Sequence, residues 1–182
     1  KIYWDYYDHL NKQPGDKWLP LSRDLERYIP KEYIVEMKGI SDGSGIAYDK
    51  ILFLNTLTTI SMVDGCFAFA FKDNGSKIIT LRQIDISTNS PYSKNMILYI
   101  IKPQHGYGFA AFLNPGMVSG ETGVNENGIT ISENNIQIKQ TEWDIIPINH
   151  LSRLVLQYSV SIDDVERLLR EKQVYSSILL FV

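Results

Sequence analysis

Residues 64–86 read DGCFAFAFKDNGSKIITLRQIDI, and this stretch decides how the second half of the chain folds. Apolar and small residues alternate after Cys66, which is typical of a β-strand. The tetrapeptide DNGS at 73–76 has the composition of a hairpin turn. We therefore predict two strands, over 66–72 and 77–86, whose pairing folds Arg82 and Asp85 back toward Cys66.

Cys66 is the single cysteine of the 182 residues. A lone cysteine is often a small buried hydrophobe, but a neighbouring cation raises the fraction of thiolate and makes the sulfur a nucleophile. Arg82 would stabilise the thiolate or bind a substrate carboxylate. The alternatives are a structural thiol, a surface charge at Arg82 and a strand-end cap at Asp85. The occurrence of Cys66, Arg82 and Asp85 together at this spacing favours the interpretation of Cys66 as a nucleophile.

The chain before Cys66 has helical periodicity, and the chain after it is mostly strand-like. We predict helices over 3–10, 21–29, 31–40 and 48–61, with a loop at 42–45. Beyond the first hairpin we predict strands over 95–102, 108–114, 117–121, 128–134 and 177–182, and helices over 150–158 and 162–171. Ser161 is the expected N-cap of the last helix. Hairpins followed by helices predict an α+β fold.

Composition excludes several classes of protein. Apolar residues make up 44% of the chain and charged residues 21%, as in soluble globular proteins. A net charge of −3 argues against a nucleic-acid surface, and no apolar run approaches the length of a membrane span. No cofactor or metal is expected. Residue 1 is Lys, so we expect a trimmed chain; the compartment is left open, with the cytoplasm favoured.

The segment 122–135 reads TGVNENGITISENN and carries a family resemblance together with Gly65-Cys66, Arg82 and Asp85. These motifs resemble the N-terminal-nucleophile cysteine hydrolases of the acyl-coenzyme A:isopenicillin N acyltransferase type, to which choloylglycine hydrolases and acid ceramidase are related. The resemblance runs from about Ile34 to the end of the chain. It departs from the pattern at Leu81, where glycine is usual, and at Gln83, where asparagine is usual.

The resemblance implies an αββα four-layer sandwich and self-cleavage between Gly65 and Cys66. Residues 1–65 would be a helical pro-segment or small subunit, and 66–182 the N-terminal part of the catalytic domain. The product would be a heterodimer of the two fragments. The family fold continues with further strands, so we expect more chain or a second polypeptide to complete the sheet.

Self-cleavage also supplies a base, because the freed α-amine of Cys66 has an ordinary pKa near 8. The resemblance implies that Asp85 orients this amine and that an asparagine amide holds the oxyanion. Counting along the motif gives Asn135 or Asn134, with neither preferred. Asn125 and Gly128 are predicted to be structural turn residues, and His105 a surface residue.

These residues predict an amidohydrolase or acyltransferase acting on a small amide or thioester through a Cys66 acyl-enzyme. Two alternatives stay open: an inactive relative or partner subunit, and a papain-type peptidase using His105. The second fits less well, because a papain-type cysteine begins a helix and the residues after Cys66 alternate like a strand.

Overall fold

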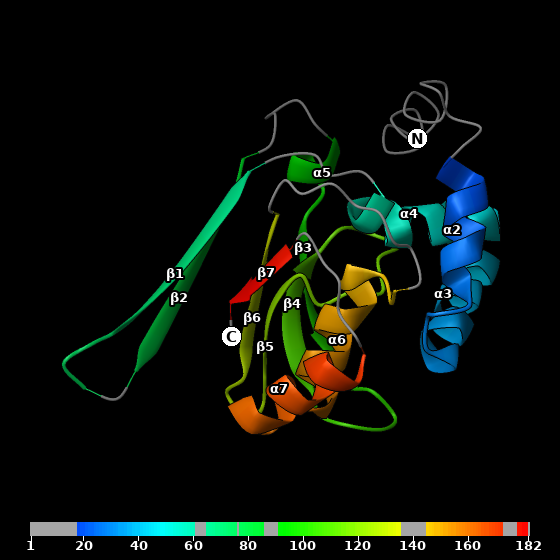
Figure 1. Cartoon of the computed structure of the whole chain (residues 1–182). Helices are drawn as coiled ribbons and strands as arrows, with labels where there is room; N and C mark the ends of the chain where they lie inside the picture. The colour runs from blue at the N-terminus through cyan, green and yellow to red at the C-terminus, as the bar shows by residue number, and fades with distance from the viewer. Residues whose placement is uncertain are drawn as a thin grey trace.

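The computed structural model describes residues 18–60, 65–75, 77–85, 91–135, 145–172 and 178–181. The helix predicted over 3–10 lies outside these residues. Helices and antiparallel sheets together confirm the α+β class (Figure 1). The helices are α2 (Trp18–Glu26), α3 (Lys31–Ser44), α4 (Tyr48–Ile60), α5 (Pro91–Lys94), α6 (Ile148–Tyr158) and α7 (Ile162–Glu171). The strands are β1 (Cys66–Lys72), β2 (Ile78–Ile84), β3 (Ile97–Ile101), β4 (Phe109–Leu113), β5 (Thr122–Asn125), β6 (Thr130–Asn135) and β7 (Ile178–Phe181).

The strands form two separate antiparallel sheets. Strands β3, β4, β5, β6 and β7 lie side by side in that order, so β7 occupies the edge next to β6. Strands β1 and β2 form the predicted hairpin, with Cys66 opposite Ile84 and Lys72 opposite Ile78. The hairpin lies beside β6 and projects away from the larger sheet (Figure 1).

Two connected clusters of buried side chains make up the core. One packs the inward face of β4 and β6 against α6 and α7, through Phe109, Leu113, Ile131, Val155 and Leu156 among others. The other packs α3 and α4 against α6, through Met37, Leu52, Val118, Leu151 and Leu154 among others. The helices that precede Cys66 are therefore part of the same core as the helices that follow the sheet.

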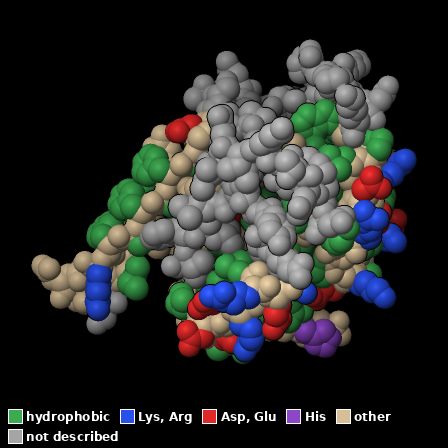
Figure 2. Space-filling model, in the orientation of Figure 1, with side chains coloured by type: hydrophobic (Ala, Val, Ile, Leu, Met, Phe, Trp, Pro, Cys, Tyr) green, Lys and Arg blue, Asp and Glu red, His purple; other side chains and the backbone are tan. Residues whose placement is uncertain are grey.

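The outward face of the hairpin is unusually apolar for an exposed surface. Phe67, Phe69 and Phe71 are each 43–48% exposed, and their rings stack in a row. Ile79 and Leu81 extend this row onto β2. Figure 2 shows hydrophobic side chains along the projecting hairpin. Contiguous apolar surface of this kind marks a site of further packing.

The loop predicted at 42–45 is wrong, because α3 continues through Ser44. Gly45 ends the helix instead, with a φ of 69° and its N–H donating to the Ser41 carbonyl at 2.9 Å. A left-handed glycine is a common helix terminator. Gly43 lies within the helix, and the residue that terminates it stands two positions later.

The strand predicted over 117–121 is also wrong. The Val118 N–H donates to Asn55 Oδ1 at 2.6 Å, and the Val118 carbonyl contacts His150 Nδ1 at 2.9 Å. Side chains of α4 and α6 thus satisfy the backbone that a neighbouring strand would otherwise pair. A Cβ at Gly120 would meet the α6 backbone at Arg153 N at 2.8 Å. The strand begins later, at Thr122.

Two local predictions, at Ser161 and Gly128, are confirmed. The Ser161 side chain caps α7 by accepting a hydrogen bond from the Asp164 N–H at 3.2 Å. Gly128 has a φ of 86° in the turn between β5 and β6. Within the described ranges, no helix combines the length and apolarity that a bilayer crossing requires.

Candidate active site

The hairpin register brings Cys66 and Arg82 onto one face. Arg82 stands opposite Ala68, two residues from Cys66, so the alternation of strand side chains aims both toward the larger sheet. Arg82 Nη2 donates to Cys66 Sγ at 3.7 Å. The predicted meeting of these two residues is therefore present in the geometry, with a cation at the sulfur.

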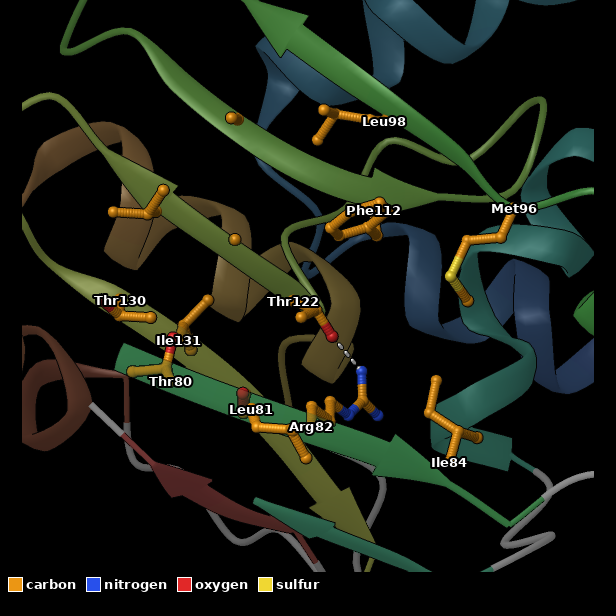
Figure 3. Close-up of a pocket in the computed structure, with 14 residues that line it drawn as sticks. Thr80, Leu81, Arg82, Ile84, Met96, Leu98, Phe112, Thr122, Thr130 and Ile131 are labelled. Atoms are coloured by element: carbon orange, nitrogen blue, oxygen red, sulfur yellow. Dashed lines mark hydrogen bonds between the residues drawn. The ribbon is translucent and has the colours of Figure 1, made fainter. Parts of the chain in front are cut away.

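The Arg82 side chain is fixed by the start of β5. Its Nη1 donates to the Glu121 carbonyl at 3.3 Å and to Thr122 Oγ1. Figure 3 shows the guanidinium directed from β2 across to Thr122. Two contacts on one nitrogen leave Nη2 for the sulfur. Thr122 was missed in the sequence, where it reads only as the first residue of the Thr-Gly motif.

Asp85 contacts Gly65 through its backbone. The Asp85 N–H donates to the Gly65 carbonyl at 2.8 Å, and this carbonyl belongs to the Gly65–Cys66 peptide bond. The Asp85 carboxylate lies just above Gly65, where an added Cβ would stand 3.0 Å from Oδ2. Gln83 Nε2 donates to Asp85 Oδ1 at 3.0 Å and so orients the carboxylate. Gln83 appeared in the sequence only as a departure from the family pattern.

Asn134 and Asn135 are the last two residues of β6, in which successive side chains alternate between the two faces. Ile131 belongs to the buried cluster that includes residues of α6, and both Ile131 and Ser132 line a cavity beneath the hairpin. Asn134 shares the face of Ser132. Asn134 is buried, with Nδ2 3.4 Å from the Ser132 carbonyl and Oδ1 without a hydrogen-bond partner among the described residues. Asn135 pairs with Ile178 in the strand ladder.

An open cavity of about 460 Å³ lies between β2 and the outward face of the larger sheet. Arg82 and Thr122 line it near the Cys66 end, and much of the remaining wall is apolar, as with Leu98 and Phe112 (Figure 3). A polar end and an apolar body are features of a pocket that binds a small molecule.

Two buried carboxyl groups lie behind Arg82. Glu121 and Glu133 are 3% and 1% exposed. Burial raises the pKa of Glu133 to about 8, and the negative charge of Glu121 acts in the same direction, while the Ser152 hydroxyl and Arg82 oppose it. Neither acid was singled out in the sequence. The signal was available, since Glu133 follows Ile129 and Ile131 at the inward positions of an alternating strand.

The structure describes two of the three histidines, and each lies on an element other than the hairpin that carries Cys66. His105 is exposed in the turn between β3 and β4, at the Asn125 end of β5, whereas Arg82 contacts Thr122 at the other end. His150 is fully buried against the Val118 carbonyl, and burial lowers its pKa to about 3. Cys66 begins a strand and not a helix. The papain-type alternative therefore has no geometric support in the described residues.

Asn125 acts as a structural clamp, as predicted. Its Nδ2 donates to the carbonyls of Leu156 and Ser159 at 2.9 and 2.8 Å. Its Oδ1 accepts from the N–H groups of Asn127 and Ile129 at 3.0 and 2.9 Å. The amide thereby joins the β5–β6 turn to the end of α6.

Comparison with known proteins agrees with this geometry. The profile of the family described as acyl-coenzyme A:6-aminopenicillanic acid acyl-transferase matches residues 71–182, which is more than half of the chain. The chain belongs to this family. The matched stretch begins within β1, after Cys66, and includes Arg82, Asp85 and the whole five-stranded sheet.

The chain is also similar to Protein dcd1A of Dictyostelium discoideum, with 28% identity over 170 residues. The similarity covers 80% of this chain and 36% of that protein, so the chain spans about a third of the length of this relative.

Proposed function

We propose that this chain is a self-processing acyltransferase or amidohydrolase of the N-terminal-nucleophile type, with Cys66 as the nucleophile. The proposal rests on two contacts at the Gly65–Cys66 junction. Arg82 donates a hydrogen bond to the Cys66 sulfur, and the Asp85 N–H donates one to the Gly65 carbonyl. One contact activates a thiol and the other polarises the carbonyl next to it.

Self-cleavage follows from these contacts. The Cys66 sulfur attacks the Gly65 carbonyl carbon, and the Asp85 N–H stabilises the oxyanion that forms. The intermediate collapses with transfer of a proton to the Cys66 nitrogen, which leaves a thioester between Gly65 and the sulfur. One water molecule hydrolyses the thioester, giving a Gly65 carboxylate, a free thiol and a free α-amine. Residues 1–65 then become the small subunit.

The mature site would work on an external acyl group. The freed α-amine, oriented by Asp85, takes the thiol proton, and the sulfur attacks the carbonyl of an amide or thioester. Asn134 is favoured over Asn135 as a side-chain oxyanion donor, because Asn134 lies on the face that meets the hairpin. The acyl-enzyme passes its acyl group to water or to an amine. The apolar cavity beside Arg82 is the proposed place for the acyl chain.

The same proposal includes the αββα sandwich. The larger sheet with α6 and α7 supplies one helical layer and one sheet, and the hairpin is the proposed start of the second sheet. The exposed row of Phe67, Phe69 and Phe71 supports this proposal, since a second helical layer would cover it.

Acyl-enzyme trapping tests the proposal. The protein is incubated with a panel of p-nitrophenyl esters and thioesters of increasing acyl length, quenched in acid, and analysed by mass spectrometry. We expect one acyl group per chain, on Cys66, and none on Cys66→Ala. Arg82→Lys keeps a cation and should label faster than Arg82→Met. Equal labelling of wild type and Cys66→Ala would refute the assignment of the nucleophile.

A further inference from the structure

Glu121 and Glu133 are neighbours on adjacent strands. The Glu133 N–H donates to the Glu121 carbonyl at 3.0 Å, next to the pairing of Thr122 with Ser132. Both side chains are almost completely buried, and each affects the ionisation of the other. Two carboxylates in such a place repel one another, and the usual outcome is that one keeps its proton.

The hydrogen bonds around the two acids are consistent with one shared proton. Glu121 accepts from Asn149 Nδ2 at 3.0 Å and from Thr58 Oγ1 at 3.5 Å, as a carboxylate would. Both oxygens of Glu133 and Oδ1 of Asn149 are buried and make no hydrogen bond of ordinary geometry among the described residues, although the Ser152 hydroxyl lies close enough to lower the pKa of Glu133. The oxygens of an ionised Glu133 and Oδ1 of Asn149 are all acceptors. A proton on Glu133 adds a donor to this buried group.

Arg82 connects the acids to the nucleophile. Its Nη1 donates to the Glu121 carbonyl, its Nη2 donates to Cys66 Sγ, and its charge acts on Glu133. Arg82 Nε is buried without a partner, so no carboxylate is bonded directly to it among the described side chains. The charge of Arg82 lowers the pKa of Glu133, so the guanidinium and this acid act on one another electrostatically.

We propose that Glu121 and Glu133 act as one acid pair that holds a single proton and a single negative charge. We further propose that this charge determines the strength of the electrostatic field that Arg82 exerts at the Cys66 sulfur. Both are positioning residues. The groups that the described elements direct at the pair include Arg82 from β2, Asn149 and Ser152 from α6, and Thr58 from α4.

The proposal predicts how Cys66 reacts as the pH rises. Loss of the remaining proton, at about pH 8, places a second negative charge near Arg82. The field of the guanidinium at the sulfur is then weakened, and we expect Cys66 to react more slowly with an alkylating reagent. A simple alkylating reagent reports this effect without any acyl substrate. The outcome is consequently independent of whether the chain transfers acyl groups.

The experiment measures the rate of Cys66 alkylation by iodoacetamide from pH 6 to pH 10. It compares the wild type with Glu133→Gln, Glu121→Gln and the double variant. Glu166→Gln is the matched control, because Glu166 is an exposed glutamate on α7. Cys66 is the single cysteine, so the mass gain reports one thiol. Circular dichroism checks that each variant is folded.

Above about pH 8 the alkylation rate of the wild type should be roughly threefold lower than the rate expected for a thiol with no titrating neighbour. The rate of Glu133→Gln should follow the curve expected for such a thiol. At pH 6.5 each single variant should stay within about threefold of the wild type. The double variant should react at least about fivefold faster, because no carboxylate then opposes Arg82. Superimposable curves for wild type and Glu133→Gln, or effects of the two substitutions that merely multiply, would overturn the proposal.

A second measurement uses the wild type alone, so it does not require any variant to fold. Carbon-13 labelling of the glutamate carboxyl groups allows NMR titration of the wild type. One glutamate should keep the chemical shift of a protonated acid at pH 7 and titrate at about pH 8. A spectrum in which every glutamate is ionised at pH 7 would overturn the proposal directly.

Discussion

Substitution of Glu133 by glutamine should remove a pH dependence of stability that the wild type shows. In the unfolded chain Glu133 loses its proton near its ordinary pKa of 4.5, whereas in the folded protein it keeps the proton until about pH 8. Between these values the folded state binds one more proton than the unfolded state. Stability must therefore fall as the pH rises through this window.

The magnitude follows from the two pKa values. A full proton difference costs about 1.4 kcal/mol per pH unit, so stability would fall by about 4 kcal/mol from pH 5 to pH 8. Coupling to Glu121 divides the ionisation between two acids, and we expect a loss of at least about 2 kcal/mol. Glutamine has nearly the same shape and no charge, so Glu133→Gln should be the more stable protein at pH 8.

The assay is urea unfolding of wild type, Glu133→Gln and the control Glu166→Gln at pH 5, 6, 7 and 8, followed by tryptophan fluorescence. Other titrating groups cancel in the difference between wild type and variant. The reasoning would be refuted by a difference that stays constant across the four pH values, or by one in which the wild type gains stability relative to the variant as the pH rises.

Four further substitutions have expected outcomes that test separate parts of the proposed structure and mechanism. Gly65→Ala places a Cβ 3.0 Å from Asp85 Oδ2 and should slow self-cleavage by at least about tenfold in a denaturing-gel time course; an unchanged rate would contradict the proposed geometry. Leu52→Ala opens the buried contact between α4 and α6, at a cost of about 2–5 kcal/mol, and should let cleaved fragments separate on size exclusion, where wild-type fragments stay together. Gly123→Val puts a Cβ 2.6 Å from the backbone of the neighbouring strand and should lower the unfolding midpoint sharply. Gly39→Ala, at an open helical position, should raise the free energy of unfolding by about 0.5–1 kcal/mol. Similar unfolding midpoints for the two variants would contradict the packing.

Much of the fold was predictable because local chemistry and tertiary packing agree. The alternation after Cys66 and the DNGS turn specify the hairpin to within two residues at each end. The Ser161 cap marks the start of α7. In each case the residues that form the element also supply the interactions that hold it, so no distant partner has to be known.

The misassigned segments are those whose partners lie far away in the sequence. Val118 reads as a strand residue, but its backbone bonds to Asn55 and His150, which lie 63 and 32 residues away. The short helix α5 was not predicted either. It has only four residues, too few for a helical periodicity to appear.

The candidate site was predictable in part for the same reason. Cys66, Arg82, Gly65 and Asp85 lie in one hairpin, so its register alone brings them together. The groups that support Arg82 come from other elements, and no sequence spacing connects them to it. The choice between Asn134 and Asn135 needed the face of β6 that meets the hairpin, which depends on the tertiary arrangement.

The intact mass of the protein under denaturing conditions tests the central claim most directly. The account predicts two fragments whose masses place the break between Gly65 and Cys66, and a single unbroken chain for Cys66→Ala. An unbroken wild-type chain after prolonged incubation in the folded state, or a break at another bond, would contradict the proposed N-terminal-nucleophile mechanism.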